Sequence, residues 1–278
     1  MMRSLLYVPA DSERFIGKAH ERGADAIILD LEDSVAPAHK AAARDALASS
    51  VARVRQGGAK VFVRINGTQE GQQADAVAAC RAGATGLVVP KVQRAEELAA
   101  LAAVLEPVEA EMNRPALRFI ALIEDPAAVL NAAAIARGPR LLGLATGGED
   151  LALALGALPT PAVLHLPKLL VHYAAKAQGL LSFGLLRTVA DYSDLEAIGA
   201  FVREAREHGF DGATCVHPSV VPLLNSGFSA SAEELDWARR VIALAEQQPG
   251  AFALDGKMID APVIARARRL IGGYGSKD

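Results

Sequence analysis

Eight short runs of apolar residues recur along the chain, and any fold must bury all of them. Each run is about as long as a β-strand, and most are nearly continuous in apolar character, as expected for strands covered on both faces. The segments between them are rich in Ala and long enough for helices, and several end at a glycine. The runs are Leu5–Val8, Ala26–Leu31, Val61–Ile65, Gly86–Pro90, Phe119–Ile123, Leu141–Ala145, Leu180–Leu186 and Gly212–Val216. The longer helical segments are Lys40–Arg55, Gln69–Ala82, Ala95–Met112 and Asp194–His208, and the glycines are Gly23, Gly83, Gly138, Gly179 and Gly209.

Eight strand–helix units in 278 residues, of which 51% are hydrophobic, predict an α/β fold of the (β/α)₈ TIM-barrel type. A doubly wound open sheet is the competing fold. It would be favoured by a GxGxxG turn after the first strand, which this sequence lacks; the pair Gly147-Gly148 follows the sixth run instead. We predict a barrel over residues 1–230 and a C-terminal helical arm over residues 231–278. The arm is expected to hold two helices and a linker, Gly250–Asp260, and to pack on its own barrel or on a neighbouring subunit.

The composition excludes several classes of function. A net charge of −3 gives no electrostatic case for binding nucleic acid or an anionic membrane. Cys80 and Cys215 have no CxxC spacing, which argues against a zinc site or a disulfide framework and fits a reduced, cytoplasmic protein. The first apolar run is too short for a signal sequence, and the longest uncharged stretch, Leu151–Pro167, is interrupted by prolines and does not predict a membrane span.

Two acidic residues follow neighbouring strands of the predicted barrel. Glu124 ends the fifth run and Asp150 comes shortly after the sixth. Because the active sites of TIM barrels lie at the carboxyl ends of the strands, these carboxylates can face one point and hold a divalent cation. Each also has a structural alternative. Glu124 can cap the helix that starts near Pro126, and Asp150 can be a favourable acid in the first turn of a helix.

Ionisable residues gather at most of the other predicted strand ends as well. Arg64 lies inside the third run, where a buried guanidinium needs an anion. That anion can be a substrate, or it can be Asp30 or Glu32, which would make the pairing structural. Together with Lys91 and the acids, Arg64 predicts a site for an anionic substrate and a metal ion. The strand-end groups are Asp11, Asp30, Glu32, Asp33, Arg64, Asn66, Lys91, Glu124, Asp125, Glu149, Asp150, Arg187 and His217.

Ordered motifs along most of the chain resemble a known family. They are Leu5–Pro9, Ile28–Val35, Val63–Asn66, Val89–Val92, Leu122–Glu124, Gly148–Leu151, Gly209–Gly212, Val216–Ser219 and Asp255–Pro262. In this order they resemble the citrate lyase β-subunit-like branch of the HpcH/HpaI aldolase family, over about Arg3 to Ile271.

The resemblance implies a TIM barrel that acts as a Mg²⁺-dependent carbon–carbon lyase. The implied substrate is a 3-hydroxyacyl-CoA thioester of the citryl-, malyl- or citramalyl-CoA type, cleaved to an acyl-CoA such as acetyl-CoA and a 2-oxo acid. By position, Glu124 and Asp150 resemble the family's metal ligands, Glu124 also contacting the substrate. Arg64 resembles the arginine that binds the substrate carboxylate during catalysis.

The resemblance also implies contacts at the two ends of the chain. Tyr7, Arg14 and Lys18 resemble the residues that contact the CoA substrate. Asp260 resembles a catalytic acid on a C-terminal arm that reaches a neighbouring subunit, which implies a homotrimer or a multiple such as a hexamer. Asp260 is also a sound N-cap for a helix beginning near Pro262.

The sequence departs from the family pattern at three places, all around the expected acyl or CoA region. Ala10 replaces a glycine, the segment Ser182–Thr188 lacks the usual acidic and glycine pattern, and Val163–Lys168 lacks a common arginine. Three alternatives therefore stay open. They are a class II pyruvate-type aldolase that does not use CoA, a malyl-CoA thioesterase-like enzyme, and a non-catalytic subunit that binds a CoA ester.

Overall fold

The computed structural model describes residues 2–187, 192–248 and 250–275, and it divides into two compact units. The first unit is Met2–Phe228 and the second begins at Ser229. In the first unit, eight parallel strands form one sheet in the order β7-β6-β5-β4-β3-β2-β1-β8. A bridge between Phe183 of β7 and Gly212, directly before β8, brings the first and last strands of this order together. The predicted TIM barrel is therefore confirmed.

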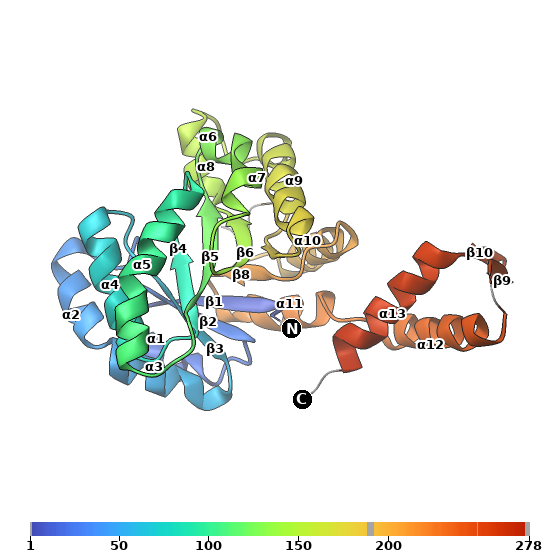
Figure 1. The fold of residues 1–278 in the computed structure, drawn as a ribbon, viewed down its shortest axis with the longest axis horizontal. Coiled ribbons are helices and arrows are strands. Elements are labelled where there is room, and N and C mark those ends of the chain that lie inside the picture. The colour runs from blue at the N-terminus through green and yellow to red at the C-terminus, as the bar shows by residue number, and fades with distance from the viewer. Residues whose placement is uncertain (1, 188–191, 249, 276–278) are drawn as a thin grey trace. The chain divides into compact units, whose positions relative to one another are not determined.

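Figure 1 shows β1 to β6 and β8 at the centre of this unit, with helices on the outside. The strands are β1 (Ser4–Pro9), β2 (Ala26–Asp30), β3 (Lys60–Arg64), β4 (Gly86–Val89), β5 (Arg118–Ile123), β6 (Leu141–Thr146), β7 (Leu181–Phe183) and β8 (Ala213–Cys215). The helices are α1 (Glu13–Ala19), α2 (Lys40–Asp45), α3 (Leu47–Val54), α4 (Gln69–Arg81), α5 (Ala95–Glu111), α6 (Pro126–Leu130), α7 (Ala132–Ile135), α8 (Gly148–Ala154), α9 (Pro161–Ala177), α10 (Leu195–Glu207) and α11 (Val221–Gly227). Short 3₁₀ turns occupy Pro37–His39, Arg55–Gly57 and Pro218–Val220.

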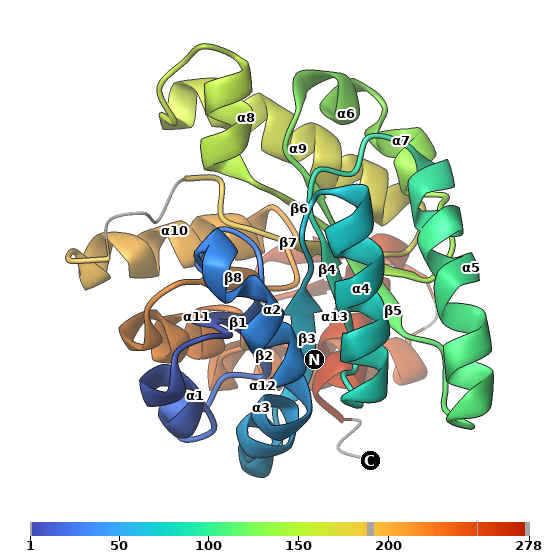
Figure 2. The same cartoon turned by 90° about the vertical axis from the view of Figure 1, so that its left-hand side faces the viewer.

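Successive side chains of each strand point to opposite faces of the sheet, and they form two separate core layers. In β1, Leu5 packs inside the barrel with Ile28 and Phe62, whereas Leu6 and Val8 pack between the sheet and the helices. Both layers are apolar, which explains why the strand sequences are nearly continuous apolar runs. The outer layer is completed by the helices, of which α4 and α5 lie side by side in Figure 2.

Helix boundaries differ from the prediction at one main place. The segment predicted as one helix over Lys40–Arg55 is two helices, α2 and α3, that meet at Ala46. At the predicted helix ends, Gly23, Gly83, Gly179 and Gly209 all have positive φ, as a left-handed helix end requires. Near Gly138 this conformation is taken instead by Arg140, with φ 61°.

The second unit contains two helices and a β-hairpin. The helices are α12 (Ala232–Gln247) and α13 (Ala261–Gly275), and the strands are β9 (Phe252–Leu254) and β10 (Lys257–Ile259). The hairpin forms within the predicted linker, Gly250–Asp260, which connects the two helices. Its turn residues, Asp255 and Gly256, both have positive φ, which is the conformation that Asp-Gly favours in two-residue hairpin turns. A small core of Ala238, Val241, Ile259 and Ala267 holds this unit together. Across both units, the described helices are all too short or too polar to cross a membrane.

Candidate functional site

A cavity of about 630 Å³ lies at the carboxyl ends of the barrel strands. Its wall includes residues at the carboxyl ends of β1, β2, β3, β5 and β6 and residues of the loops after β2, β5 and β6. The strand-end residues selected from sequence that line it are Asp30, Asp33, Arg64, Glu124, Glu149, Asp150 and Arg187. The described lining carries more negative than positive groups. The carboxylates are Asp30, Asp33, Glu124, Glu149 and Asp150, and the cations are Arg64, Lys168 and Arg187.

Arg64, the last residue of β3, is held by a carboxylate on the neighbouring strand. Its Nε and Nη2 donate to the two oxygens of Asp30 at 2.6 and 2.7 Å. Asp30 also accepts from the backbone N–H groups of Glu32 and Ser34. Burial alone would raise the pKa of Asp30, but the hydrogen bonds and charge of Arg64 outweigh burial and lower it. The structural pairing considered for Arg64 is therefore present, and it fixes the orientation of the guanidinium.

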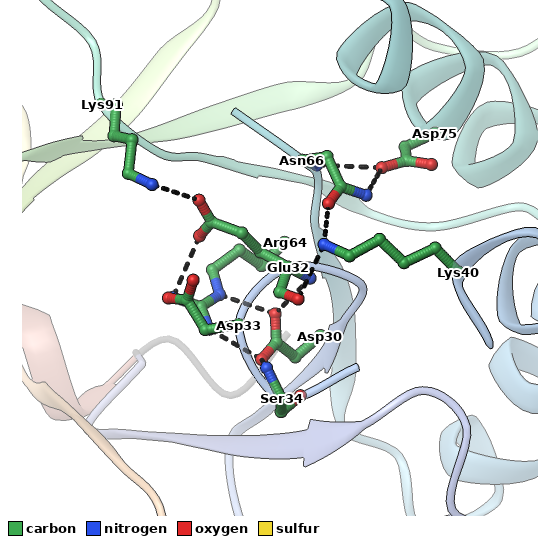
Figure 3. A network of polar contacts seen from close by, with 9 residues as sticks. All are labelled: Asp30, Glu32, Asp33, Ser34, Lys40, Arg64, Asn66, Asp75 and Lys91. Carbon is green, nitrogen blue, oxygen red and sulfur yellow. Dashed lines mark hydrogen bonds and ion pairs between the residues drawn. The ribbon is translucent and has the colours of Figure 1, made fainter. Parts of the chain in front are cut away.

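Two further acids and an aromatic ring surround the same guanidinium. Nη1 of Arg64 lies 3.0 Å from Oδ2 of Asp33 and 3.2 Å from Oε2 of Glu32 (Figure 3). The guanidinium carbon lies 5.1 Å from the ring centre of Tyr7, within cation–π range. Burial raises the pKa of the Tyr7 phenol far above its usual value, so this group stays neutral at physiological pH.

A second polar group beside Arg64 is structural. Asn66 donates through its backbone and side-chain nitrogens to Oδ2 of Asp75 and accepts a hydrogen bond from Lys40. Lys40 also donates to the backbone oxygen of Glu32 at 2.9 Å (Figure 3). Asn66, one of the strand-end residues selected from sequence, therefore anchors α2 and α4 to the barrel rim.

Glu124 follows β5 and is 6% exposed. Its Oε2 accepts a hydrogen bond of 2.8 Å from the backbone N–H of Lys91. Burial is the main reason that its pKa rises to about 7; the charges of Asp150 and Glu32 add to this, and the Lys91 N–H partly offsets it. The helix-cap alternative for Glu124 is not what the structure shows, because Asp125 accepts from the first backbone N–H groups of α6.

Glycine at position 147 makes room for Glu124. A Cβ atom on Gly147 would lie 2.4 Å from Oε1 of Glu124, which is closer than atoms can approach. The loop from Gly147 to the first turn of α8 thus packs directly on the Glu124 carboxylate. Asp150 lies in that first turn, is half-buried and lines the same cavity. Its position suits the helix N-terminus as well as a ligand role.

The remaining predicted site residues lie in different places. Tyr7 lines the cavity, whereas Arg14 and Lys18 are exposed on α1 and are not among the cavity's described lining residues. Asp260 belongs to the second unit, where its side chain and backbone oxygens accept from Val263 and Ile264 at the start of α13. Asp260 therefore adopts the helix-cap geometry that the sequence allowed.

Lys168 is a cavity residue that the sequence did not single out. It is 7% exposed, and Nζ donates to the backbone oxygens of Leu185 and Arg187 at 2.9 and 3.3 Å. Burial lowers its pKa to about 8, despite the opposing charge of Glu149. A signal was present, because Lys168 shares one face of α9 with Leu164 and Val171, where an apolar residue is expected.

The fold and the strand-end residues define a TIM-barrel protein with an acidic cavity at the usual active-site face. The chain belongs to the HpcH/HpaI aldolase/citrate lyase family, whose model matches residues 3–218. The resemblance seen in the ordered motifs is thereby confirmed.

The chain is similar to named proteins and to solved structures of this family. A (3S)-malyl-CoA thioesterase of Cereibacter sphaeroides is 37% identical over 281 residues, which cover 97% of this chain and 93% of that protein. A citrate lyase subunit beta-like protein of Mycobacterium tuberculosis is 33% identical and covers 96% of this chain and 93% of its own length. The structure of CitE from that organism, in complex with magnesium, acetoacetate and coenzyme A, has a TM-score of 0.81 and 33% identity, and it covers 98% of each chain.

Proposed function

We propose that this protein is a Mg²⁺-dependent carbon–carbon lyase. Its substrate would be a 3-hydroxyacyl-CoA thioester of the citryl-, malyl- or citramalyl-CoA type, and its products an acyl-CoA and a 2-oxo acid. The observation that carries the proposal is the convergence of Glu124, Asp150 and Arg64 on one cavity, in a chain of this family.

The carboxylates of the cavity fit a hard divalent cation. Mg²⁺ is commonly bound by one or two protein carboxylates, with waters or substrate filling its other positions. Among the described residues, no three His, Cys, Asp or Glu side chains gather into a fuller metal site. The lining has more acids than cations, and a bound cation would stabilise this negative charge. Burial is the main cause of the raised pKa of Glu124, and a cation beside this carboxylate would lower that pKa again. Bound by Glu124 and Asp150, Mg²⁺ would polarise the carbonyl of the 2-oxo acid.

Arg64 supplies a fixed positive charge for a substrate carboxylate. Its pKa is raised by the hydrogen bonds and charge of Asp30, despite burial, so the guanidinium is always protonated. Asp30 and the Tyr7 ring hold it in one orientation, with Nη1 away from the Asp30 contacts. A preoriented guanidinium recognises a planar carboxylate at a smaller entropic cost than a free one. We place Tyr7 at this acyl end of the cavity, since its ring lies under Arg64.

The CoA moiety and the proton-transfer group are assigned by family position. Arg14 and Lys18 would bind CoA phosphates, which suits two exposed cations on α1. Asp260 would be the proton partner of the thioester enolate, supplied by a neighbouring subunit of a homotrimer or hexamer. A cytoplasmic location would fit a reaction that draws on acyl-CoA pools.

The direct test is a substrate panel. The purified chain would be incubated with citryl-, malyl-, methylmalyl- and citramalyl-CoA, with Mg²⁺ or with EDTA, and the released 2-oxo acid would be quantified. We expect cleavage of at least one substrate with Mg²⁺ and none with EDTA. Glu124→Gln and Asp150→Asn should each lower the rate by more than about 100-fold. Asp45→Asn, which removes an exposed acid of α2, is the matched control and should keep full activity. Full activity in either site variant would refute the metal assignment.

A second candidate is thioester hydrolysis, because one relative is named a (3S)-malyl-CoA thioesterase. Measuring free CoA in the same assays separates the two reactions. Cleavage alone yields an acyl-CoA and a 2-oxo acid, whereas hydrolysis yields free CoA and leaves the carbon–carbon bond intact.

A further inference from the structure

Asp33 occupies the side of Arg64 that faces the cavity. Its Oδ2 lies 3.0 Å from Nη1 of Arg64, and both residues line the cavity (Figure 3). Asp30 takes the opposite side of the guanidinium through Nε and Nη2. A guanidinium offers two two-pronged edges, and Asp30 fills one of them. The other edge includes Nη1, the atom that Asp33 contacts.

The three acids around Arg64 differ strongly in exposure. The side chains of Asp30 and Glu32 are 3% and 6% exposed, whereas that of Asp33 is 59% exposed. A buried carboxylate that lost its partner would carry a large desolvation penalty. An exposed one is solvated by water when it leaves, so its ion pair is weak. Asp33 is therefore the partner that can be exchanged at little cost.

The local backbone allows the same exchange. Asp33 lies in a turn between β2 and the 3₁₀ segment Pro37–His39, and the backbone N–H groups of its neighbours Glu32 and Ser34 are bonded to Asp30. These bonds hold the turn in place through Asp30 and not through the Asp33 side chain. Rotation of the Asp33 side chain into solvent would leave the turn and the Asp30–Arg64 pair intact.

We propose that Asp33 is an internal competitor for the carboxylate-binding edge of Arg64 and thereby sets the affinity of the site for carboxylate ligands. This inference rests on the proposed function, since it assumes that the carboxylate of a 2-oxo acid binds at Arg64. Asp33 and the buried Glu32 both contact Nη1, and an incoming carboxylate displaces Asp33, the exposed one of the two. The exchange substitutes one ion pair for another, so ligands that bring no carboxylate cannot drive it.

The exchange also screens ligands by charge. A neutral amide in place of the carboxylate would have to displace Asp33 without replacing its charge at Arg64. The competitor thus weakens binding of every ligand somewhat, and it weakens neutral analogues most. Selectivity of this kind arises from a repulsive or competing element as well as from attraction.

Calorimetric titration of pyruvate and oxaloacetate, in the presence of Mg²⁺, tests this directly. Asp33→Asn should bind both acids about two- to five-fold more tightly than the wild type, the range expected from removing a weak exposed ion pair. Asp45→Asn removes one exposed acid on α2 and should leave affinity unchanged. Equal unfolding midpoints for the two variants and the wild type would show that the change in affinity does not come from a change in stability.

A crystal structure with Mg²⁺ and pyruvate gives the second readout. We expect a pyruvate oxygen within hydrogen-bond distance of Nη1 of Arg64 and the Asp33 carboxylate turned into solvent. Unchanged or weaker binding by Asp33→Asn, or an Asp33 that keeps its contact when pyruvate is bound, would overturn this inference alone. If the wild type binds no 2-oxo acid in the presence of Mg²⁺, the proposed function fails and this inference fails with it.

Discussion

The backbone N–H of Lys91 donates to Oε2 of Glu124 over 2.8 Å from a left-handed conformation, with φ 55°. Its Nζ meanwhile lies 3.2 Å from Oε1 of Glu32. One residue thus joins the carboxylate proposed to bind the metal to the acids around Arg64. The backbone and the side chain of Lys91 serve different partners, so they can be separated by mutation.

Lys91→Gly and Lys91→Ala separate these two contributions. Both variants lose the ion pair with Glu32 and keep the N–H that bonds to Glu124. Only glycine adopts positive φ without strain, so Lys91→Gly should be more stable than Lys91→Ala by about 1 kcal/mol. Urea unfolding of the two variants measures this difference. Equal stabilities would show that the left-handed conformation is not retained.

Gly147→Ala should displace Glu124. The new Cβ would lie 2.4 Å from Oε1 and 2.5 Å from Cγ of a carboxylate that is buried and cannot move freely. We expect Mg²⁺ affinity to fall by about 10- to 100-fold, as when the support of a metal ligand is removed. Gly148→Ala is the matched control, because its nearest neighbour is the tip of the Leu164 side chain at 3.1 Å. Comparable losses in the two variants would contradict the prediction.

The contribution of Glu124 to the stability of the metal-free protein should fall as pH rises from about 4.5 to 7. The pKa of Glu124 is raised to about 7, so over this range the folded state binds a proton that the unfolded state has released. Proton uptake by the folded state means that stability decreases with increasing pH. Glu124→Gln should remove this part of the slope, and urea midpoints between pH 4.5 and 8 would measure it. Mg²⁺ should release up to one proton on binding near pH 6, detectable by calorimetry in buffers of different ionisation enthalpy.

Lys168 should give a slope of the opposite sign at higher pH. Burial lowers its pKa to about 8, so between about pH 8 and 10.5 the folded state has lost a proton that the unfolded state retains. Stability of the wild type should therefore rise with pH across this range, relative to Lys168→Met. The difference between the two unfolding midpoints as a function of pH is the measurement. If the wild type and Lys168→Met have parallel pH profiles of stability, burial does not lower the pKa of Lys168.

The barrel was predictable because its signal is local. Strands buried on both faces appear in the sequence as continuous apolar runs. The helices between them appear as Ala-rich segments that end at glycines such as Gly83. Short strands were harder, because β7 is only Leu181–Phe183 within a longer apolar run. The hairpin within the linker of the second unit also leaves a signal, which is Asp255-Gly256 between two short runs.

The site was predictable only in part. Barrel geometry brings strand ends together, so Glu124, Asp150 and Arg64 could be selected from their positions alone. Asp30, Glu32 and Asp33 contact Arg64 differently because their side chains differ in exposure and in distance from the guanidinium. Adjacent positions in a sequence do not encode such differences. The burial of Lys168 depends likewise on the loop after β7, whose carbonyl oxygens bond its ammonium group.

The barrel is closed between β7 and β8 by the bridge of Phe183 and Gly212. A closed sheet has no free edge, so transient opening is expected where the strand pairing is shortest. In the described part of the chain this is the seam between β7 and β8, which has one bridge, whereas every other neighbouring pair of barrel strands has at least three paired residues. Backbone amides of these two strands should therefore exchange with deuterated water sooner than those of β2 to β5. The wall of the cavity that contains Phe183, Leu185 and Cys215 lies along this seam. Opening at this seam would therefore also expose the inside of the cavity to solvent.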